Sequence, residues 1–346
     1  MTVKITRPSI DIRGTLDELN KPSGIAGNAM LAAETPQEQF NLIGAGRKNL
    51  IINGGFQVSQ RGDYKSGAVA AVNNAYCIDR WNTWLVSVTA TQQLQTATIN
   101  GVLKNTFKIT STGTAAGAIG FAQRIETQDF PIGGNITVSC WMKSNNAFAR
   151  LRQNNVANTD SNSITHSGGG NWEFMSWTLD TTGTAPNHSS INFGAICYDA
   201  GNVAINTGDY IEVADFQLEI GSVATPFEHR SYGEELALCQ RFYQKVGNGS
   251  AYTAFGIFNA ETTGAATCAY VYSQEMRAAP SASKGGAWQF FTGGITSSLN
   301  TFNGFNATKT TCRLEAAPFA ALTVGRSYIL RCENDANAFI AFDAEL

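Results

Sequence analysis

Charged residues are scarce in this chain. Only 15% of the 346 residues are charged, whereas an ordinary globular protein has about 25%. The 24 Lys and Arg and the 27 Asp and Glu leave a net charge of −3. Nothing in this balance provides the basic surface that holds a nucleic acid or an anionic membrane. We therefore predict no nucleic-acid partner and no membrane insertion.

Paired cysteines and targeting segments are also lacking. The seven cysteines form no CxxC pair and have no histidine at ligand spacing, which predicts reduced, buried thiols and disfavours an oxidised secreted scaffold. The first residues, MTVKITRPSIDIRG, contain no apolar signal-peptide core. The uncharged run 81–103 has polar side chains throughout, so it is predicted to form strands rather than a membrane span.

What the chain does have is glycine, aromatic residues and short alternating runs. The 34 glycines and the 10% aromatic content are typical of an all-β protein punctuated by turns. Apolar residues recur at every second position in NLIINGGFQVSQ (residues 49–60) and in NITVSCWMKS (135–144). Between residues 208 and 221 the alternation changes phase near Ala214, which predicts a β-bulge.

The length predicts more than one domain. We expect tandem antiparallel β-sandwiches of the jelly-roll type, with a short helical N-terminal segment and one inter-domain helix. The predicted units are a helical N-terminal segment (1–48), a jelly-roll sandwich (49–230), a connecting helix (231–246) and a C-terminal sandwich (247–346). Within the first sandwich, the polar stretch 152–171 is predicted to be a flexible loop.

Two helical signals support this division. In residues 1–48 the helices are short, and their apolar side chains lack a partner within the segment; these are Ile25, Met30, Leu31, Phe40, Leu42 and Ile43. In residues 231–246, Ser231 and Glu234 form a capping box, Arg241 and Lys245 fall in the last turn, and Gly247 is expected to end the helix.

The search for catalytic chemistry finds no local signature. His166, His188 and His229 lie in no HExxH or triad-like motif, and the chain has neither a GxSxG elbow nor a phosphate-binding loop. Four acids, Asp209, Glu212, Asp215 and Glu219, lie close together, as glycan hydrolysis would require. The simpler interpretation is that they face outward from one strand. A structural Ca²⁺ at Asp215 is the alternative, and otherwise no cofactor or metal is predicted.

The aromatic residues divide into two groups. Trp81, Trp84, Trp141, Trp172 and Trp177 are interpreted mostly as core of the first sandwich. Five residues of the second sandwich lie among Gly, Ser and Asn, and we predict that they form loop-borne stacking platforms for sugar rings: Trp288, Phe290, Phe291, Phe302 and Phe305.

Four strings together resemble a known family. GIAGNAMLAAETPQEQFNLIGAG resembles the helical segment that precedes receptor-binding modules in the tail fibres of tailed bacteriophages. NLIINGGFQVSQRG, followed by Tyr76 and Asp79-Arg80-Trp81, resembles the opening of the carbohydrate-binding-module-type jelly roll of those fibres. Residues 208–245 are similar to its close and the helix that follows, and YVYSQEMRAAPSASKGG resembles the start of a C-terminal fibre domain.

The resemblance implies a homotrimeric, non-catalytic tail fibre of the virion, assembled in the host cytoplasm. In such a fibre, residues 1–48 would be the virion-attachment and trimerisation segment, in contact with phage tail proteins. Residues 247–346 would be the receptor-binding domain, which binds a host surface polysaccharide or lipopolysaccharide. Two alternatives stay open, which are a fibre-borne glycan hydrolase or depolymerase and a purely structural tail adaptor.

Overall fold

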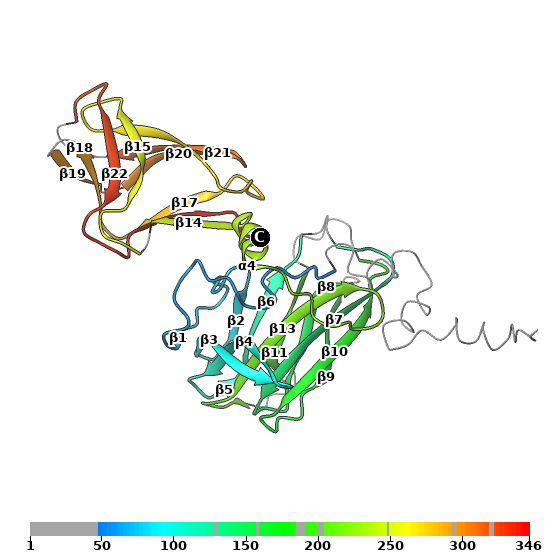
Figure 1. Cartoon of the computed structure of the whole chain (residues 1–346). Helices are drawn as coiled ribbons and strands as arrows, with labels where there is room; N and C mark the ends of the chain where they lie inside the picture. The colour runs from blue at the N-terminus through cyan, green and yellow to red at the C-terminus, as the bar shows by residue number, and fades with distance from the viewer. Residues whose placement is uncertain are drawn as a thin grey trace, which may run out of the picture.

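Antiparallel strands make up most of the computed structural model (Figure 1). It describes residues 48–126, 130–156, 159–184, 191–198, 204–247, 249–292, 295–299, 301–317 and 322–346. Within these ranges the only helix is α4 (Tyr232–Gln240). The predicted all-β fold of antiparallel sheets is therefore confirmed. The predicted helices of residues 1–48, with their apolar side chains, lie outside the described residues.

Two sheets face each other in the first sandwich. One has the order β1 (Val69–Ala70), β3 (Ala90–Ile99), β4 (Val102–Ser111), β13 (Tyr210–Ile220), β7 (Asn135–Ser144), β10 (Trp172–Asp180). The other has the order β2 (Asn82–Val86), β6 (Ala118–Arg124), β11 (Asn192–Tyr198), β8 (Ala149–Val156), β9 (Thr159–Thr165). A short pair, β12 (Ala204–Ile205) and β5 (Ala115–Ala116), lies beside them.

Alternate residues of both sheets point inward and form one apolar core. Its centre is a group of edge-to-face and tilted aromatic rings, with centroid separations from 5.0 Å for Phe107 and Phe121 to 6.4 Å for Phe56 and Phe121. Trp81 packs against Phe216 at 5.1 Å. Such pairs add to the stability gained by burying the rings.

The predicted bulge in β13 is confirmed. Pairing of β13 with β7 shifts between Ala214 and Gln217, and Asp215 has a φ of 53°. The extra residue returns Phe216 and Leu218 to the core face that Ile211 and Val213 occupy.

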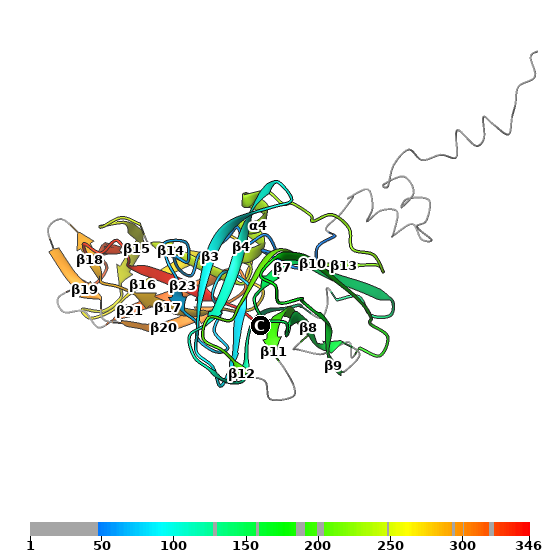
Figure 2. The ribbon, with the colours of Figure 1, turned by 90° about the horizontal axis from the view of Figure 1, so that it is seen from below.

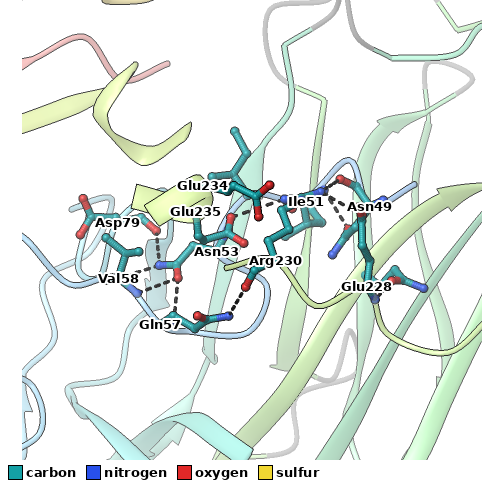
Figure 3. A network of polar contacts seen from close by, with 12 residues as sticks. Asn49, Ile51, Asn53, Gln57, Val58, Asp79, Glu228, Arg230, Glu234 and Glu235 are labelled. Atoms are coloured by element: carbon teal, nitrogen blue, oxygen red, sulfur yellow. Dashed lines mark hydrogen bonds and ion pairs between the residues drawn. The ribbon is translucent and has the colours of Figure 1, made fainter. Parts of the chain in front are cut away.

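Residues 49–60 were expected to form a strand, and this prediction is wrong. The segment is a series of bends and turns, with positive φ at Asn53 (60°) and Phe56 (52°). Several of its backbone N–H groups donate to side chains (Figure 3), and two backbone bonds join it to β13, from the Leu50 N–H to Leu218 and from the Phe216 N–H to Gly54. Gly54 is required here, because a Cβ at this position would lie 2.1 Å from the carbonyl oxygen of Phe216.

The helix predicted for 231–246 is shorter than expected. Its capping box is present, with Ser231 Oγ accepting from the Glu234 backbone N–H and the Glu234 carboxylate accepting from the Ser231 N–H. The helix ends at Gln240, however, and Tyr243–Gly247 forms strand β14. These residues pair with the strand β23 (Phe339–Asp343), and the bonds of this pairing replace the backbone bonds that a continued helix would have made.

The C-terminal part also contains two sheets. The smaller has the order β14, β23, β17 (Ser281–Gly285). The larger has the order β19 (Ile295–Leu299), β18 (Trp288–Thr292), β22 (Ser327–Cys332), β15 (Ala254–Ala260), β16 (Ala266–Val271), β21 (Thr311–Ala317), β20 (Thr301–Ala307). A second apolar cluster, which includes Phe258, Tyr328 and Phe342, forms their core.

Two arginines, of which Arg80 is buried, join the two parts beside α4, where the C-terminus lies (Figure 1). The Arg80 guanidinium pairs with the Glu345 carboxylate, donates to the carbonyl oxygen of Arg124 at 2.7 Å and stacks on the Phe242 ring at 3.5 Å. Arg61 pairs with Glu345 at 3.0 Å. Seen from below, the C-terminal sheets extend from one end of the first sandwich (Figure 2).

Within the described ranges, no helix has both the length and the apolarity to cross a membrane. The cysteine prediction is confirmed, since all seven are free thiols and only Cys268 is partly exposed.

This burial predicts thiols that react slowly. Because burial disfavours the thiolate, it raises the pKa of Cys77, Cys197 and Cys268 to about 12. At pH 8 only about one such thiol in 10⁴ is then ionised. We expect no more than one thiol to react rapidly with Ellman's reagent in the native protein, and seven after denaturation. Rapid reaction of several native thiols would contradict the buried placement.

Candidate functional site

Two of the five residues of the aromatic site predicted in the C-terminal part, Trp288 and Phe290, are core residues, so the prediction is wrong for them. Trp288 and Phe290 are 1% and 0% exposed. They lie on β18 in the second core rather than on a loop, and Trp288 Nε1 donates to the carbonyl oxygen of Gly285 at 3.0 Å. Phe291 is half-buried beneath Arg331, whose guanidinium carbon lies 3.8 Å from the ring centroid.

The other two predicted residues lie on β20. Phe305 is half-buried and packs against the core, with its ring 6.1 Å from that of Phe342. The side chain of Phe302 is outside what the structure describes. The Gly- and Asn-rich neighbourhood misled the prediction, because these small residues belong to strands whose other face is buried.

Tryptophans of the first sandwich, interpreted from sequence mostly as core, divide differently. Trp81 is fully buried and Trp177 packs against the core. Trp141 and Trp172 instead lie on the outer face of the six-stranded sheet. Their strand neighbours Met142 and Met175 point into the core, and alternate residues of a strand face opposite ways.

An aromatic pair, Trp141 and Phe174, forms the centre of this outer face. The two residues are direct partners in the β7–β10 register. Their ring centroids are 5.3 Å apart with an interplanar angle of 58°. Phe174 is 49% exposed, so the outer face presents aromatic surface to solvent at the β7–β10 edge of the sheet. We call this pair the aromatic platform.

Charged and hydroxyl groups surround the platform. The register places Lys143 beside Trp172 and beside Glu212, and Lys143 Nζ lies 5.9 Å from the Trp172 ring centroid. On the far side of Glu212 the next partner is Lys108, whose Nζ lies 4.2 Å from the Tyr210 ring. Opposite charges therefore alternate across three strands, which stabilises the sheet face.

The Tyr210 hydroxyl is held in its neutral form. Burial raises the pKa of this phenol, and the Glu212 carboxylate raises it further. A phenol is already protonated at neutral pH, and the raised pKa extends to higher pH the range in which this hydroxyl can donate a hydrogen bond. Glu212 itself is 5% exposed and accepts from Thr106 Oγ1 at 2.7 Å.

The four acids near β13 are buried rather than exposed as expected for outward-facing residues. Long neighbouring side chains cover them, because β13 is an inner strand of its sheet. Asp209 accepts from Asn146 Nδ2 at 2.7 Å, and Glu219 accepts from the Thr225 N–H at 2.8 Å. Each carboxylate has a local donor.

A lysine occupies the place that the calcium interpretation of Asp215 would give to Ca²⁺. The Asp215 carboxylate pairs with Lys104 Nζ. No group of three or more His, Cys, Asp or Glu residues suited to a metal occurs in the described part of the chain. A second cation at Asp215 would have to displace Lys104, so the geometry does not favour Ca²⁺ there.

The arrangement suits binding of a sugar. Sugar rings present C–H faces that pack on aromatic rings, and their hydroxyl groups bond to carboxylates, ammonium groups and phenols. The sequence contains one signal for this face. Lys143 and Trp141 alternate with core residues in 135–144, and Trp172 and Phe174 lie at the positions of 172–180 that alternate with Met175. Once the core residues of each strand are known, this alternation predicts which side chains face outward.

No family model and no curated protein matches the sequence. Among solved structures, the enzymatically active domain of tailspike protein 4 of bacteriophage CBA120 is similar with a TM-score of 0.32 and 13% identity, over 50% of this chain and 21% of its own. The carbohydrate-binding module TmCBM61, in complex with β-1,4-galactotriose, has a TM-score of 0.29 and 12% identity over 51% of this chain and 100% of its own. The arabinose-bound α-L-arabinofuranosidase MgGH51 has a TM-score of 0.32 and 17% identity over 48% of this chain and 28% of its own. The tailspike is matched over about a fifth of its length, so its activity is not carried over to this chain.

The burial of the two aromatic groups can be compared by mutation. Trp288→Ala removes a fully buried ring and should lower the free energy of unfolding by about 3–5 kcal/mol. Phe174→Ala removes a half-exposed ring and should cost less than about 1 kcal/mol. Urea unfolding followed by circular dichroism measures both. Equal losses would show that one of the two rings is misplaced.

Proposed function

We propose that this chain is a glycan-binding protein and that the outer face of the six-stranded sheet is its binding surface. One observation carries the proposal, which is the exposed aromatic platform of Trp141 and Phe174. Leaving aromatic surface in water costs free energy, and the polar neighbours on the same face offer a sugar its hydrogen bonds. A ligand that covers the rings recovers this free energy.

We further infer a role as the tail fibre, or receptor-binding protein, of a tailed bacteriophage. The resemblance of residues 24–46, 208–245 and 270–286 to fibre segments supports this role. In it, the N-terminal part attaches to phage tail proteins and three copies present their sandwiches to a host polysaccharide or lipopolysaccharide. Weak single contacts then gain avidity, because binding of one copy raises the effective concentration of the next.

The proposed role is non-catalytic. A fibre-borne hydrolase or depolymerase is the competing function, because Glu212 lies on the same face as the platform. That function would also need a second acid free to face the sugar, whereas Lys104 binds the neighbouring Asp215. A purely structural tail adaptor would leave the platform without a sugar ligand.

The platform is tested on an array of bacterial capsular polysaccharides and lipopolysaccharides. Phe174→Ala together with Trp141→Ala should weaken binding to the polysaccharide that the unaltered chain selects by about 10–100-fold, because each stacked ring contributes about 0.5–1.5 kcal/mol. The matched control is Tyr252→Ala, since Tyr252 is also 49% exposed but lies in the C-terminal part. Its loss should leave binding unchanged.

Two results would contradict this proposal. Loss of binding in the Tyr252 variant alone would move the surface to the C-terminal part. Release of reducing ends from the bound polysaccharide, abolished by Glu212→Gln, would support the hydrolase instead. The melting temperature of each variant shows whether a loss of binding reflects unfolding.

The trimer is tested by mass. Light scattering of the full chain at micromolar concentration should give three times the 37.0 kDa of one copy. Apolar residues of the N-terminal segment, which cannot bury themselves alone, are the reason. Deletion of residues 1–47 should lower the mass, and a monomeric full chain would contradict the prediction.

A further inference from the structure

A pocket of about 660 Å³ opens where the first sandwich meets the C-terminal part. The first sandwich contributes residues of the segment 57–65, α4 contributes Tyr232, and the C-terminal part contributes Lys245 on β14 and Phe339 on β23. Ligand sites occur preferentially at such junctions, and the volume lies within the range of small-molecule sites. We call it the junction pocket.

Contacts between the two parts hold the walls of the junction pocket in place. Gln60 Nε2 donates to the Asp79 carboxylate at 2.6 Å and to the carbonyl oxygen of Tyr243, on β14, at 2.9 Å. The Arg61 guanidinium pairs with Asp343 at 3.1 Å, and its carbon lies 3.8 Å from the centroid of the Tyr243 ring. Because these contacts already fix the walls, a ligand would have few protein groups to order on binding.

The junction pocket contains the ammonium group of Lys245. Its Nζ lies 4.3 Å from the centroid of the Phe339 ring and donates to the carbonyl oxygen of Arg61 at 3.4 Å. Among the residues that the structure describes, no Asp or Glu forms an ion pair with it. Burial lowers the pKa of this lysine, and the Asp79 carboxylate offsets the effect only in part. An anion placed beside Nζ would compensate for the burial of the charge.

An acid, Asp63, also lines the pocket, and its own turn supplies its hydrogen bonds. The Asp63 carboxylate accepts from the Ser66 hydroxyl, and from the backbone N–H groups of Lys65 and Ser66 at 2.8 and 3.1 Å. These bonds, that of the Ser66 hydroxyl above all, hold the pKa of Asp63 below its usual value. Lys65 is a second lysine of the lining, so the ammonium groups have more capacity left for a ligand than this carboxylate has.

Aromatic rings and amides complete the junction pocket. Tyr232 is 57% exposed, and Tyr64 is half-buried against the core of the first sandwich. Burial raises the pKa of the Tyr64 phenol to about 12, so this hydroxyl remains a donor even in mildly alkaline solution. Gln57 and Asn337 add their side-chain amides to the lining. A sugar residue requires this combination, because its C–H faces pack on rings and its hydroxyl groups bond to polar side chains.

We propose that the junction pocket binds a sugar residue that bears one acidic group, either a carboxylate or a phosphate. The acidic group pairs with the Lys245 ammonium, and the sugar ring packs against Tyr232. This is a second binding site, independent of the aromatic platform, because neither Trp141 nor Phe174 lines it. A ligand bound here would contact both parts of the molecule at once.

The test uses the full chain in calorimetric titrations with three soluble probes, D-glucuronate, D-glucose 6-phosphate and D-glucose. We expect at least one acidic probe to bind about tenfold more tightly than D-glucose, because hydrogen bonds between charged groups are stronger than those between neutral groups. The tighter of the two acidic probes shows whether the pocket takes a carboxylate or a phosphate. Lys245→Gln should weaken binding of that probe about tenfold and change the affinity for D-glucose less than about twofold.

The matched control is Lys284→Gln. Lys284 is also half-buried and lies on the same three-stranded sheet, but it pairs with Ile340, whereas Lys245 pairs with Ala341. Because successive residues of β23 face opposite ways, the two lysines lie on opposite faces of the sheet. Lys284→Gln should leave the binding of all three probes unchanged, and a loss equal to that of Lys245→Gln would overturn the proposal.

A second variant covers the case in which Lys245→Gln does not fold. Tyr232→Ala removes an exposed ring and should weaken binding of the acidic probe about threefold or more. Equal affinity for all three probes, no binding of either acidic probe, or unchanged binding in folded Lys245→Gln or Tyr232→Ala would each overturn the proposal. The polysaccharide array tests the aromatic platform separately, so the failure of one site is distinguished from the failure of the other.

Discussion

The hydrogen bonds of the buried residue Asn53 fix the segment 49–60 (Figure 3). Both parts of the molecule depend on this segment. Asn53 Oδ1 accepts from the N–H groups of Gln57 and Val58, and its Nδ2 donates to the carbonyl oxygens of Val58 and Asp79. Its N–H donates to Glu235 of α4 at 2.5 Å, and its carbonyl accepts from Trp81 Nε1 at 3.0 Å. A segment that forms no strand of its own can be buried only when side chains satisfy the backbone groups that no neighbouring strand pairs.

This constraint positions the sheet that carries the proposed binding surface. Trp81, held by Asn53, lies in the ring cluster between the two sheets, and the outer face of the six-stranded sheet carries the aromatic platform. Glu235, bound by the same residue, fixes α4, and Arg80 beside it holds the tail of the C-terminal part through Glu345. The junction is thus a network of buried hydrogen bonds and ion pairs, whose members cannot be removed singly without leaving a buried polar group unpaired.

The sequence predicted the features that depend on residues close together in the chain. These are the alternation of 135–144, the bulge at Ala214 and the Ser231–Glu234 capping box, and all three are present. The prediction was wrong where a distant partner decides. Residues 241–246 follow a helical pattern but pair with β23, and Trp288 has loop-like neighbours but is covered by the second core. Arg152 was predicted to lie in a flexible loop, but it lies on β8, where it pairs with Gly194 of β11.

The central claim is that sugars bind to the first sandwich and that the aromatic residues of β18 only stabilise the C-terminal part. Hydrogen–deuterium exchange of the full chain, with and without the polysaccharide it binds, tests this claim most directly. The account predicts ligand-dependent protection in residues 135–144 and 172–180 and none in 288–292. Protection confined to residues 249–346 would contradict it.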